Sequence, residues 1–334
     1  MQFSHPSSVS EIGGFNWSRQ ERYIWWGKLA VAILLLFAMW RMLPKDLASL
    51  KFIWTHPWHV AAAVLLRPVF TLMMAARTYS LSREVLPDLP LGAIIRATYI
   101  GQMANLVLPS GAGGDLIRGT ILWRKSNRPW PQIVTVLVID RFLGTLSLLS
   151  CVAIVSLPLL IQIIQPKWLM WGIVLGAAVL TGIWFGRDLV LNRVQHSSLW
   201  RDTASALKQM PCSPWVRAAI LALTGHLILI TSISLVFTSV GIAIGWADQA
   251  GIIALSLFFS SLPLTLGGHG IREGTLVLLI AAPMAWTRWP PFATMDAALA
   301  LAAATWFIHV VTNFMGGLIA LGLGSRITSR KPIP

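Results

Sequence analysis

One motif occurs twice in the sequence, and each copy ends in an arginine. The first copy, LPSGAGGDLIR, runs from Leu108 to Arg118, and the second, LPLTLGGHGIR, runs from Leu262 to Arg272. Both contain Leu-Pro, a Gly-Gly pair, an Ile and the final Arg at identical offsets, 154 residues apart. A guanidinium is permanently charged and holds a phosphate through two parallel hydrogen bonds. The motif therefore predicts that Arg118 and Arg272 bind an anionic, phosphate-bearing group.

The glycines of the motif predict that a new helix begins after a break at the proline. A helix N-terminus offers free backbone N–H groups and the positive end of the helix dipole, and both favour an anion. The alternative is that the glycines only permit a tight turn while the arginines reach the membrane interface. The glycines with a predicted binding role are Gly113, Gly114, Gly267 and Gly268.

Three more ionisable residues lie in apolar surroundings. Asp115 follows the first Gly-Gly pair, where it is either a favourable first-turn carboxylate or a proton carrier. His269 lies inside the second copy and is the best candidate for a titrating group. Arg67, followed by Pro68, interrupts an apolar segment, and we expect it to face the interior of the protein, where it could contact a substrate.

Acidic residues near the arginines predict ion pairing inside the membrane. Asp140 and Arg141 are adjacent, and Glu273 directly follows Arg272. Because a buried guanidinium needs a counter-charge, we expect Asp140 or Glu273 to offset Arg118, Arg141 or Arg272. An anionic ligand could displace such a carboxylate, so all of these residues are also candidates for substrate binding.

The sequence gives no pattern for a metal or a cofactor. None of His226, His269 and His309 has a second ligand at metal spacing, and we expect His309 and Asn313, which share a helix face, to form hydrogen bonds across helices. No nucleophile elbow, phosphate-binding loop or dinucleotide fingerprint is present. We therefore predict no catalytic residue, no metal and no cofactor.

Composition identifies the elements that must position these residues. The 334 residues are 56% hydrophobic and 11% charged, with a mean hydropathy of +0.70, as expected of a polytopic membrane protein. Two apolar regions, 91–124 and 249–287, are each split by one copy of the motif. The predicted full spans are 24–43, 57–79, 132–161, 168–186, 216–240 and 295–323.

The distribution of basic residues predicts the topology. The net charge of +14 is concentrated in alternate loops, which follows the positive-inside rule and does not indicate nucleic-acid binding. Both termini are then cytoplasmic, both flanks of 91–124 are cytoplasmic, and both flanks of 249–287 are external. This predicts two re-entrant helical hairpins that enter from opposite faces and meet near the midplane. The alternative is that 249–264 and 271–287 each cross the membrane.

The spacing of the motif extends to whole helices and predicts an inverted repeat. The halves are about 57–161 and 211–323, and such repeats are common in secondary transporters. We expect one transmembrane domain over 24–325, with a cytoplasmic N-terminal segment at 1–23 and a cytoplasmic tail at 326–334. The predicted fold is therefore an all-α polytopic membrane protein with an inverted repeat.

At the two motifs the chain resembles the lysylphosphatidylglycerol synthase transmembrane family, also described as flippase-like membrane proteins. The residues that carry the resemblance are Pro109 to Arg118, Leu262 to Glu273 and the pair Asp140-Arg141. The resemblance implies movement between leaflets of a lipid with an anionic or aminoacylated head group, and relatives are linked to polyprenyl-phosphate, hopanoid or glycolipid pathways. In this family the domain can be fused to an aminoacyl-transferase. The sequence ends at Pro334, so we expect a stand-alone membrane domain.

We therefore expect a multi-pass protein of the bacterial inner (plasma) membrane that translocates a phosphate-bearing lipid. The expected partners are an anionic or aminoacylated phospholipid or a polyprenyl-phosphate lipid, together with a second copy of the chain or an enzyme of lipid biosynthesis. One alternative is a membrane-embedded transferase or phosphatase that uses Asp115, Glu273 or His269 as acid or base. Another is a scaffold that does not transport lipid, which would tolerate the loss of Arg118 and Arg272.

Overall fold

The computed structural model describes residues 56–106, 108, 113–126, 128–156, 211–261, 269–281 and 293–325, and every regular element in these ranges is a helix. The all-α class predicted from the sequence is confirmed for this part of the chain. Several predicted features lie outside it: the spans 24–43 and 168–186, both terminal segments, and the glycines Gly267 and Gly268.

Four helices in the described ranges are long and apolar enough to cross a membrane. They are α3 (Pro57–Val85), α6 (Trp130–Cys151, continued by the π-helical turn η3, Val152–Ser156), α10 (Cys212–Val240) and α13 (Met295–Ser325). With a rise of about 1.5 Å per residue, 29 residues exceed the ~30 Å of a hydrocarbon core. These four helices correspond to the predicted spans 57–79, 132–161, 216–240 and 295–323. The chain is therefore a multi-pass membrane protein.

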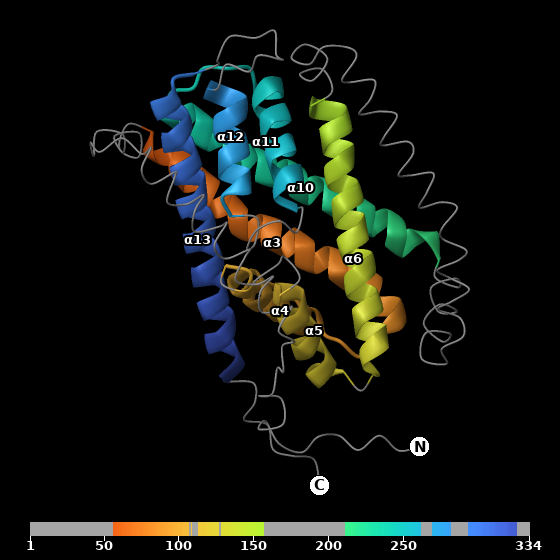
Figure 1. The fold of residues 1–334 in the computed structure, drawn as a ribbon. Coiled ribbons are helices and arrows are strands. Elements are labelled where there is room, and N and C mark those ends of the chain that lie inside the picture. Colours follow the sequence, from red (N-terminus) through yellow and green to blue (C-terminus); the bar gives the residue numbers. More distant parts are fainter. Residues whose placement is uncertain are drawn as a thin grey trace, which may run out of the picture.

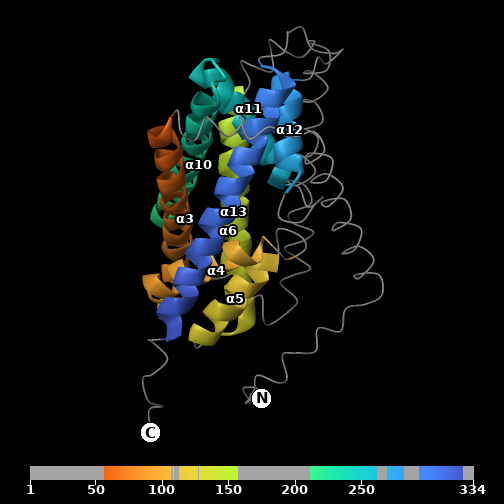
Figure 2. The same cartoon turned by 90° about the vertical axis from the view of Figure 1, so that its left-hand side faces the viewer.

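Four shorter helices occupy the two regions that the motif splits. They are α4 (Leu91–Ala104), α5 (Gly113–Lys125), α11 (Trp246–Ser261) and α12 (Ile271–Ala281). With 11 to 16 residues each, they fall short of the ~20 residues that a transmembrane helix needs. α4 packs on α5, and α11 packs on α12. The α4–α5 pair lies near one end of the long helices and the α11–α12 pair near the other (Figures 1 and 2).

The long helices α3 and α10 form the most extensive helix–helix contact in the described structure. They run in opposite directions, as the sequence colours show in Figure 1. Small residues bring them together: Ser232 donates a hydrogen bond to the carbonyl of Ala63 (2.8 Å), and Gly225 faces Phe70 and Met73. Close packing of small residues and hydrogen bonds between helices replace the hydrophobic effect within a bilayer.

Buried apolar side chains form two clusters, one around each short-helix pair. The first includes Ile230, Phe237 and Ile253 with α12, and the second includes Leu81, Leu122 and Ile133 with α4 and α5; the members named here are at most 1% exposed. Large apolar side chains such as Leu65 and Phe142 point outward instead, as expected on lipid-facing surfaces. Polar residues lie between the two clusters, in the middle of the molecule.

Candidate functional site

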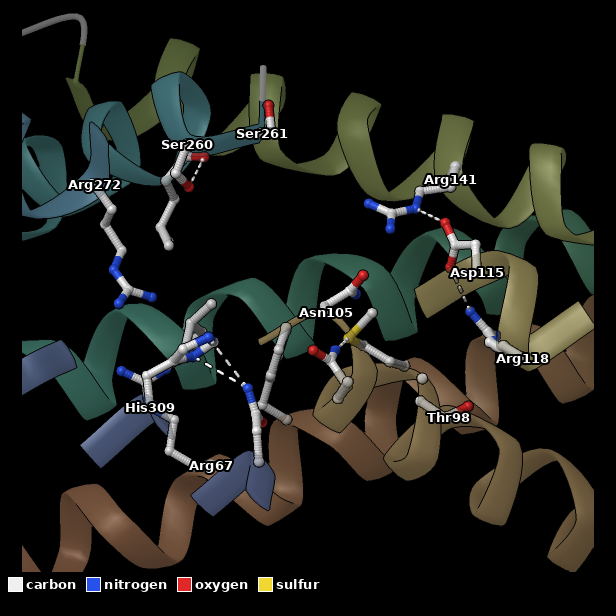
Figure 3. Close-up of a pocket in the computed structure, with 17 residues that line it drawn as sticks. Arg67, Thr98, Asn105, Asp115, Arg118, Arg141, Ser260, Ser261, Arg272 and His309 are labelled. Atoms are coloured by element: carbon white, nitrogen blue, oxygen red, sulfur yellow. Dashed lines mark hydrogen bonds and ion pairs between the residues drawn. The ribbon is translucent and has the colours of Figure 1, made fainter. Parts of the chain in front are cut away.

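A polar pocket of about 220 Å³ lies between the two short-helix pairs, and all eight described α-helices contribute to its wall. Four arginines line it: Arg67, Arg118, Arg141 and Arg272. Among the described residues, Asp115 supplies the one carboxylate in the wall. The remaining polar residues are uncharged, such as Asn105 between the two ends of the pocket (Figure 3). The apolar part of the wall consists of Phe70, Met74, Leu229 and Leu257.

Arg118 is held by a buried network centred on Asp140. Asp140, which is 1% exposed, accepts two hydrogen bonds from Arg77 (2.8 and 3.0 Å), one from the hydroxyl of Thr78 (2.9 Å) and one from Arg118 (3.0 Å). Arg118 also donates to Thr78. One carboxylate on α6 therefore joins two guanidinium groups, one from α3 and one from α5. This network fixes the direction in which Arg118 enters the pocket.

Asp115 and Arg141 form a second ion pair beside this network. The carboxylate of Asp115 accepts a hydrogen bond from Arg141 and lies 3.9 Å from Arg118. Arg141 is 52% exposed and Asp115 22% exposed, so this pair is far more accessible than the Asp140 network. Both side chains lie at the same end of the pocket as Arg118 (Figure 3).

Arg67 lies at the opposite end of the pocket, on α3. Its side chain is 5% exposed and donates a hydrogen bond to Nδ1 of His309 on α13 (3.3 Å). Because arginine cannot accept a hydrogen bond, this Nδ1 is the unprotonated nitrogen of the ring. The amide of Asn313 lies 3.2 Å from Nε2 of His309, and the ring of His269 packs edge-on against His309 at 5.6 Å between centroids. The expected hydrogen bond of His309 across helices is therefore made to Arg67.

Arg272 shares this end of the pocket, and its carboxylate partner is the adjacent residue. Nε of Arg272 donates to Glu273 Oε1 (2.8 Å), and the other carboxylate oxygen of Glu273 accepts the backbone N–H of Gly270 (2.8 Å). Gly270 has φ +83°, which favours glycine over any residue with a Cβ. Glu273 is fully buried, so it serves as a fixed counter-charge behind Arg272.

The glycines of the first motif allow two helices to approach closely. A Cβ on Gly101 of α4 would lie 2.8 Å from the carbonyl oxygen of Gly114, and one on Gly114 would overlap Gly101 and Asn105. The N–H of Gly114 donates to the side chain of Asn105 (2.8 Å). Gly113 and Gly114 begin α5, as the sequence predicts, but the N–H of Gly114 already has a partner within the protein.

The structure brings most of the predicted residues together, in two layers. Arg67, Asp115, Arg118, Arg141 and Arg272 line the pocket. Asp140, His269 and Glu273 are buried directly behind it. Each contacts one lining residue: Arg118, His309 and Arg272, respectively. Within the described ranges, no cluster of His, Cys, Asp and Glu could hold a metal ion.

Sequence reasoning missed several polar residues of the site. The positive-inside rule, applied to the sequence, places Arg77 with Arg83 in a basic cytoplasmic loop, whereas Arg77 is 4% exposed and paired with Asp140 inside the protein. Asn105, Ser260 and Ser261 line the pocket at the C-terminal ends of α4 and α11. The signal for Arg77 was its place in an apolar helix with an acidic residue on another span. Single Ser and Asn residues at helix ends give no such signal.

Two guanidinium nitrogens at the pocket have no hydrogen-bond partner in the described structure. They are Nε of Arg67 and Nε of Arg118, and both side chains are at most 5% exposed. A buried donor without a partner costs about 1–3 kcal/mol, and more when it is charged. The two ends of the pocket therefore each hold an arginine with unused hydrogen-bonding capacity.

Together, the fold and the pocket define a multi-pass α-helical membrane protein with an arginine-lined pocket between its helices. Residues 24–320 match the family model of the lysylphosphatidylglycerol synthase transmembrane region, and the chain belongs to this family. Neither a curated protein nor a solved structure matches the sequence. The match covers both motif copies and every residue that lines the pocket. The chain is therefore a membrane protein of a phospholipid-related family.

Proposed function

We propose that the protein moves a phosphate-bearing lipid between the leaflets of the bacterial inner membrane. The head group would bind in the arginine-lined pocket while the lipid chains stay in the bilayer. The observation that carries this proposal is the meeting of four arginines, three of them at most 6% exposed, in one pocket between the helices. Insertion of a charge at the bilayer centre costs about 2.5–3.5 kcal/mol, and charged residues inside membranes usually mark a substrate or ion pathway.

The arrangement of the short helices supports an inverted repeat with two re-entrant hairpins. α10 begins 155 residues after α3, α11 begins 155 residues after α4, and α3 and α10 have the same length of 29 residues. The two short pairs lie at opposite ends of the long helices and both reach the pocket (Figure 2). Transporters with such repeats bind substrate where broken helices meet, and rocking of one repeat against the other exposes the site to each side in turn.

Charge at the helix ends supports an orientation. Basic residues such as Arg83, Arg124 and Lys125 lie at the end shared with the α4–α5 pair, whereas Asp248 and Asp296 begin α11 and α13 at the other end. By the positive-inside rule, the α4–α5 end is cytoplasmic. The α4–α5 hairpin then enters from the cytoplasm and the α11–α12 hairpin from outside.

A lipid-flipping assay tests the proposal. The full chain is reconstituted in vesicles that contain phosphatidylglycerol with a fluorescent acyl chain, and a membrane-impermeant quencher reports its movement between leaflets. Loss of one charge-assisted contact is worth about 1.5–3 kcal/mol, so Arg118→Ala and Arg272→Ala should each lower the rate roughly ten- to a hundredfold. Thermal unfolding in detergent shows whether each variant is folded.

Arg128→Ala is the matched control. Arg128 is 39% exposed and pairs with Asp88 at the surface, so its removal should leave the rate unchanged. If folded Arg118→Ala and Arg272→Ala variants transport as fast as the unchanged protein, the pocket is not the transport site. If mass spectrometry shows that the lipid has been chemically altered, the protein is a lipid-modifying enzyme and the proposal falls.

A further inference from the structure

We infer that the pocket selects a lipid whose head group carries two separate negative charges, as a lipid diphosphate does. This inference rests on the proposed function and specifies its substrate class. It follows from the charges at the two ends of the pocket, which Figure 3 shows apart from one another, with Asn105 between them.

One end of the pocket holds one more positive charge than its carboxylate balances. Arg67 and Arg272 both point into this end, and Glu273 is the carboxylate beside them. Both hydrogen-bonding sides of Glu273 are occupied, by Arg272 and by the N–H of Gly270. The hydrogen bond of Arg67 is made to His309, a group that accepts only in its neutral form. Among the described residues, one guanidinium charge at this end therefore has no carboxylate to balance it.

The other end shows the same excess, although its residues differ. Arg118, Arg141 and, behind them, Arg77 carry three positive charges. Two carboxylates face them: Asp115 pairs with Arg141, and Asp140 is shared by Arg77 and Arg118. Among the described residues, one guanidinium charge is again unbalanced, and Nε of Arg118 has no hydrogen-bond partner, as is true of Nε of Arg67 at the first end.

Helix dipoles do not alter this balance. The N-terminal turns of α5 and α12 and the C-terminal ends of α4 and α11 all reach the pocket, and the positive and negative ends offset each other. The segments that connect them, 107–112 and 262–268, contain no ionisable residue in the sequence. Within the described part of the chain, the side chains named above therefore determine the charge that a ligand meets.

The size and chemistry of the pocket fit a diphosphate head group. A volume of about 220 Å³ is below the ~300–1,000 Å³ of sites that enclose a whole drug-sized ligand, so it suits a head group without its chains. A phosphodiester such as phosphatidylglycerol carries a single charge and can balance one end. A phosphomonoester carries about two charges, but on one phosphorus, so its oxygens also serve one end. A diphosphate has two charged phosphoryl groups, so by this inference each group would offset the excess charge of one end.

Binding measurements on the unchanged full chain in nanodiscs test this inference. The probes are farnesyl diphosphate, farnesyl phosphate and dioctanoyl phosphatidylglycerol, each titrated by calorimetry at neutral pH. We expect farnesyl diphosphate to bind at least tenfold more tightly than either of the others. Arg67→Gln should reduce this preference to less than threefold because one end then loses its excess charge. Arg128→Gln, at the exposed surface, should leave the preference unchanged.

The outcomes separate this inference from the proposed function. If phosphatidylglycerol or farnesyl phosphate binds as tightly as farnesyl diphosphate, the selection for two charges is wrong, while lipid transport by the pocket still stands. If none of the three anionic probes binds, both proposals fall. If Arg67→Gln remains folded and keeps the full preference for diphosphate, the charge balance at the first end does not determine the selectivity.

Discussion

Replacement of Asp140 by asparagine tests whether the buried network holds the site together. The substitution keeps the shape of the side chain and one acceptor, but it removes the counter-charge of Arg77 and Arg118, both at most 5% exposed. Removal of one partner from a buried ion pair costs about 3–5 kcal/mol, because an uncompensated charge stays buried. We therefore expect Asp140→Asn to lower the free energy of unfolding by about that amount, since two guanidinium groups lose their partner at once.

Unfolding in mixed micelles, followed by tryptophan fluorescence, measures this free energy. Asp88→Asn is the control: Asp88 is 55% exposed and pairs with Arg128, so its loss should cost ~1 kcal/mol or less. In a double-mutant cycle with Arg77→Gln, the two substitutions should cost less together than the sum of the single effects, with a coupling of about 0.5–3 kcal/mol. Additive effects, or an Asp140→Asn variant within about 0.5 kcal/mol of the unchanged protein, would refute the reasoning.

Two other predictions concern packing and topology. Gly114→Ala should destabilise the protein by about 1–3 kcal/mol because the new methyl group would overlap Gly101. Gly274→Ala is the control and should not destabilise it, because nothing lies within 4 Å of the added Cβ. Equal unfolding midpoints for the two variants would contradict this prediction. Cys212 is exposed at the start of α10, and an impermeant thiol reagent should label it only from the cytoplasmic side of the membrane. In a Cys212→Ser background, the same reagent should label a Gly245→Cys variant only from outside. Labelling of both from one side would eliminate the proposed topology.

The sequence alone predicted the parts of the structure that depend on local patterns. A long apolar segment in a membrane must be helical, so a span can be found without any periodicity of its apolar residues. The helices α3, α6, α10 and α13 were predicted by this rule. The two motif copies identified Arg118 and Arg272 as candidate binding residues, because helix breakers and a charge inside an apolar region cost free energy and so need a functional reason. Arg67 was recognisable for the same reason.

Contacts between helices could not be predicted in this way. Asp140 was correctly expected to pair with an arginine, but the sequence could not show that it collects partners from both α3 and α5. Arg77 was misassigned for a related reason: a basic residue near a span end fits a cytoplasmic loop as well as a buried ion pair. The spacing along the chain does not tell these apart, because pairing across 63 residues depends on how the helices cross.

The Asp140 network also restricts how the molecule can move. Separation of α5 from α3 and α6 would leave an unpaired charge buried in the protein at a cost of about 3–5 kcal/mol, so fewer than about one molecule in a hundred would be in that state. These three helices therefore form one mechanical unit that carries Arg77, Arg118 and Arg141. If the protein moves lipid as proposed, the motion that opens the pocket to the far side of the membrane should keep this unit intact and displace the elements opposite it, α11 and α12 among them.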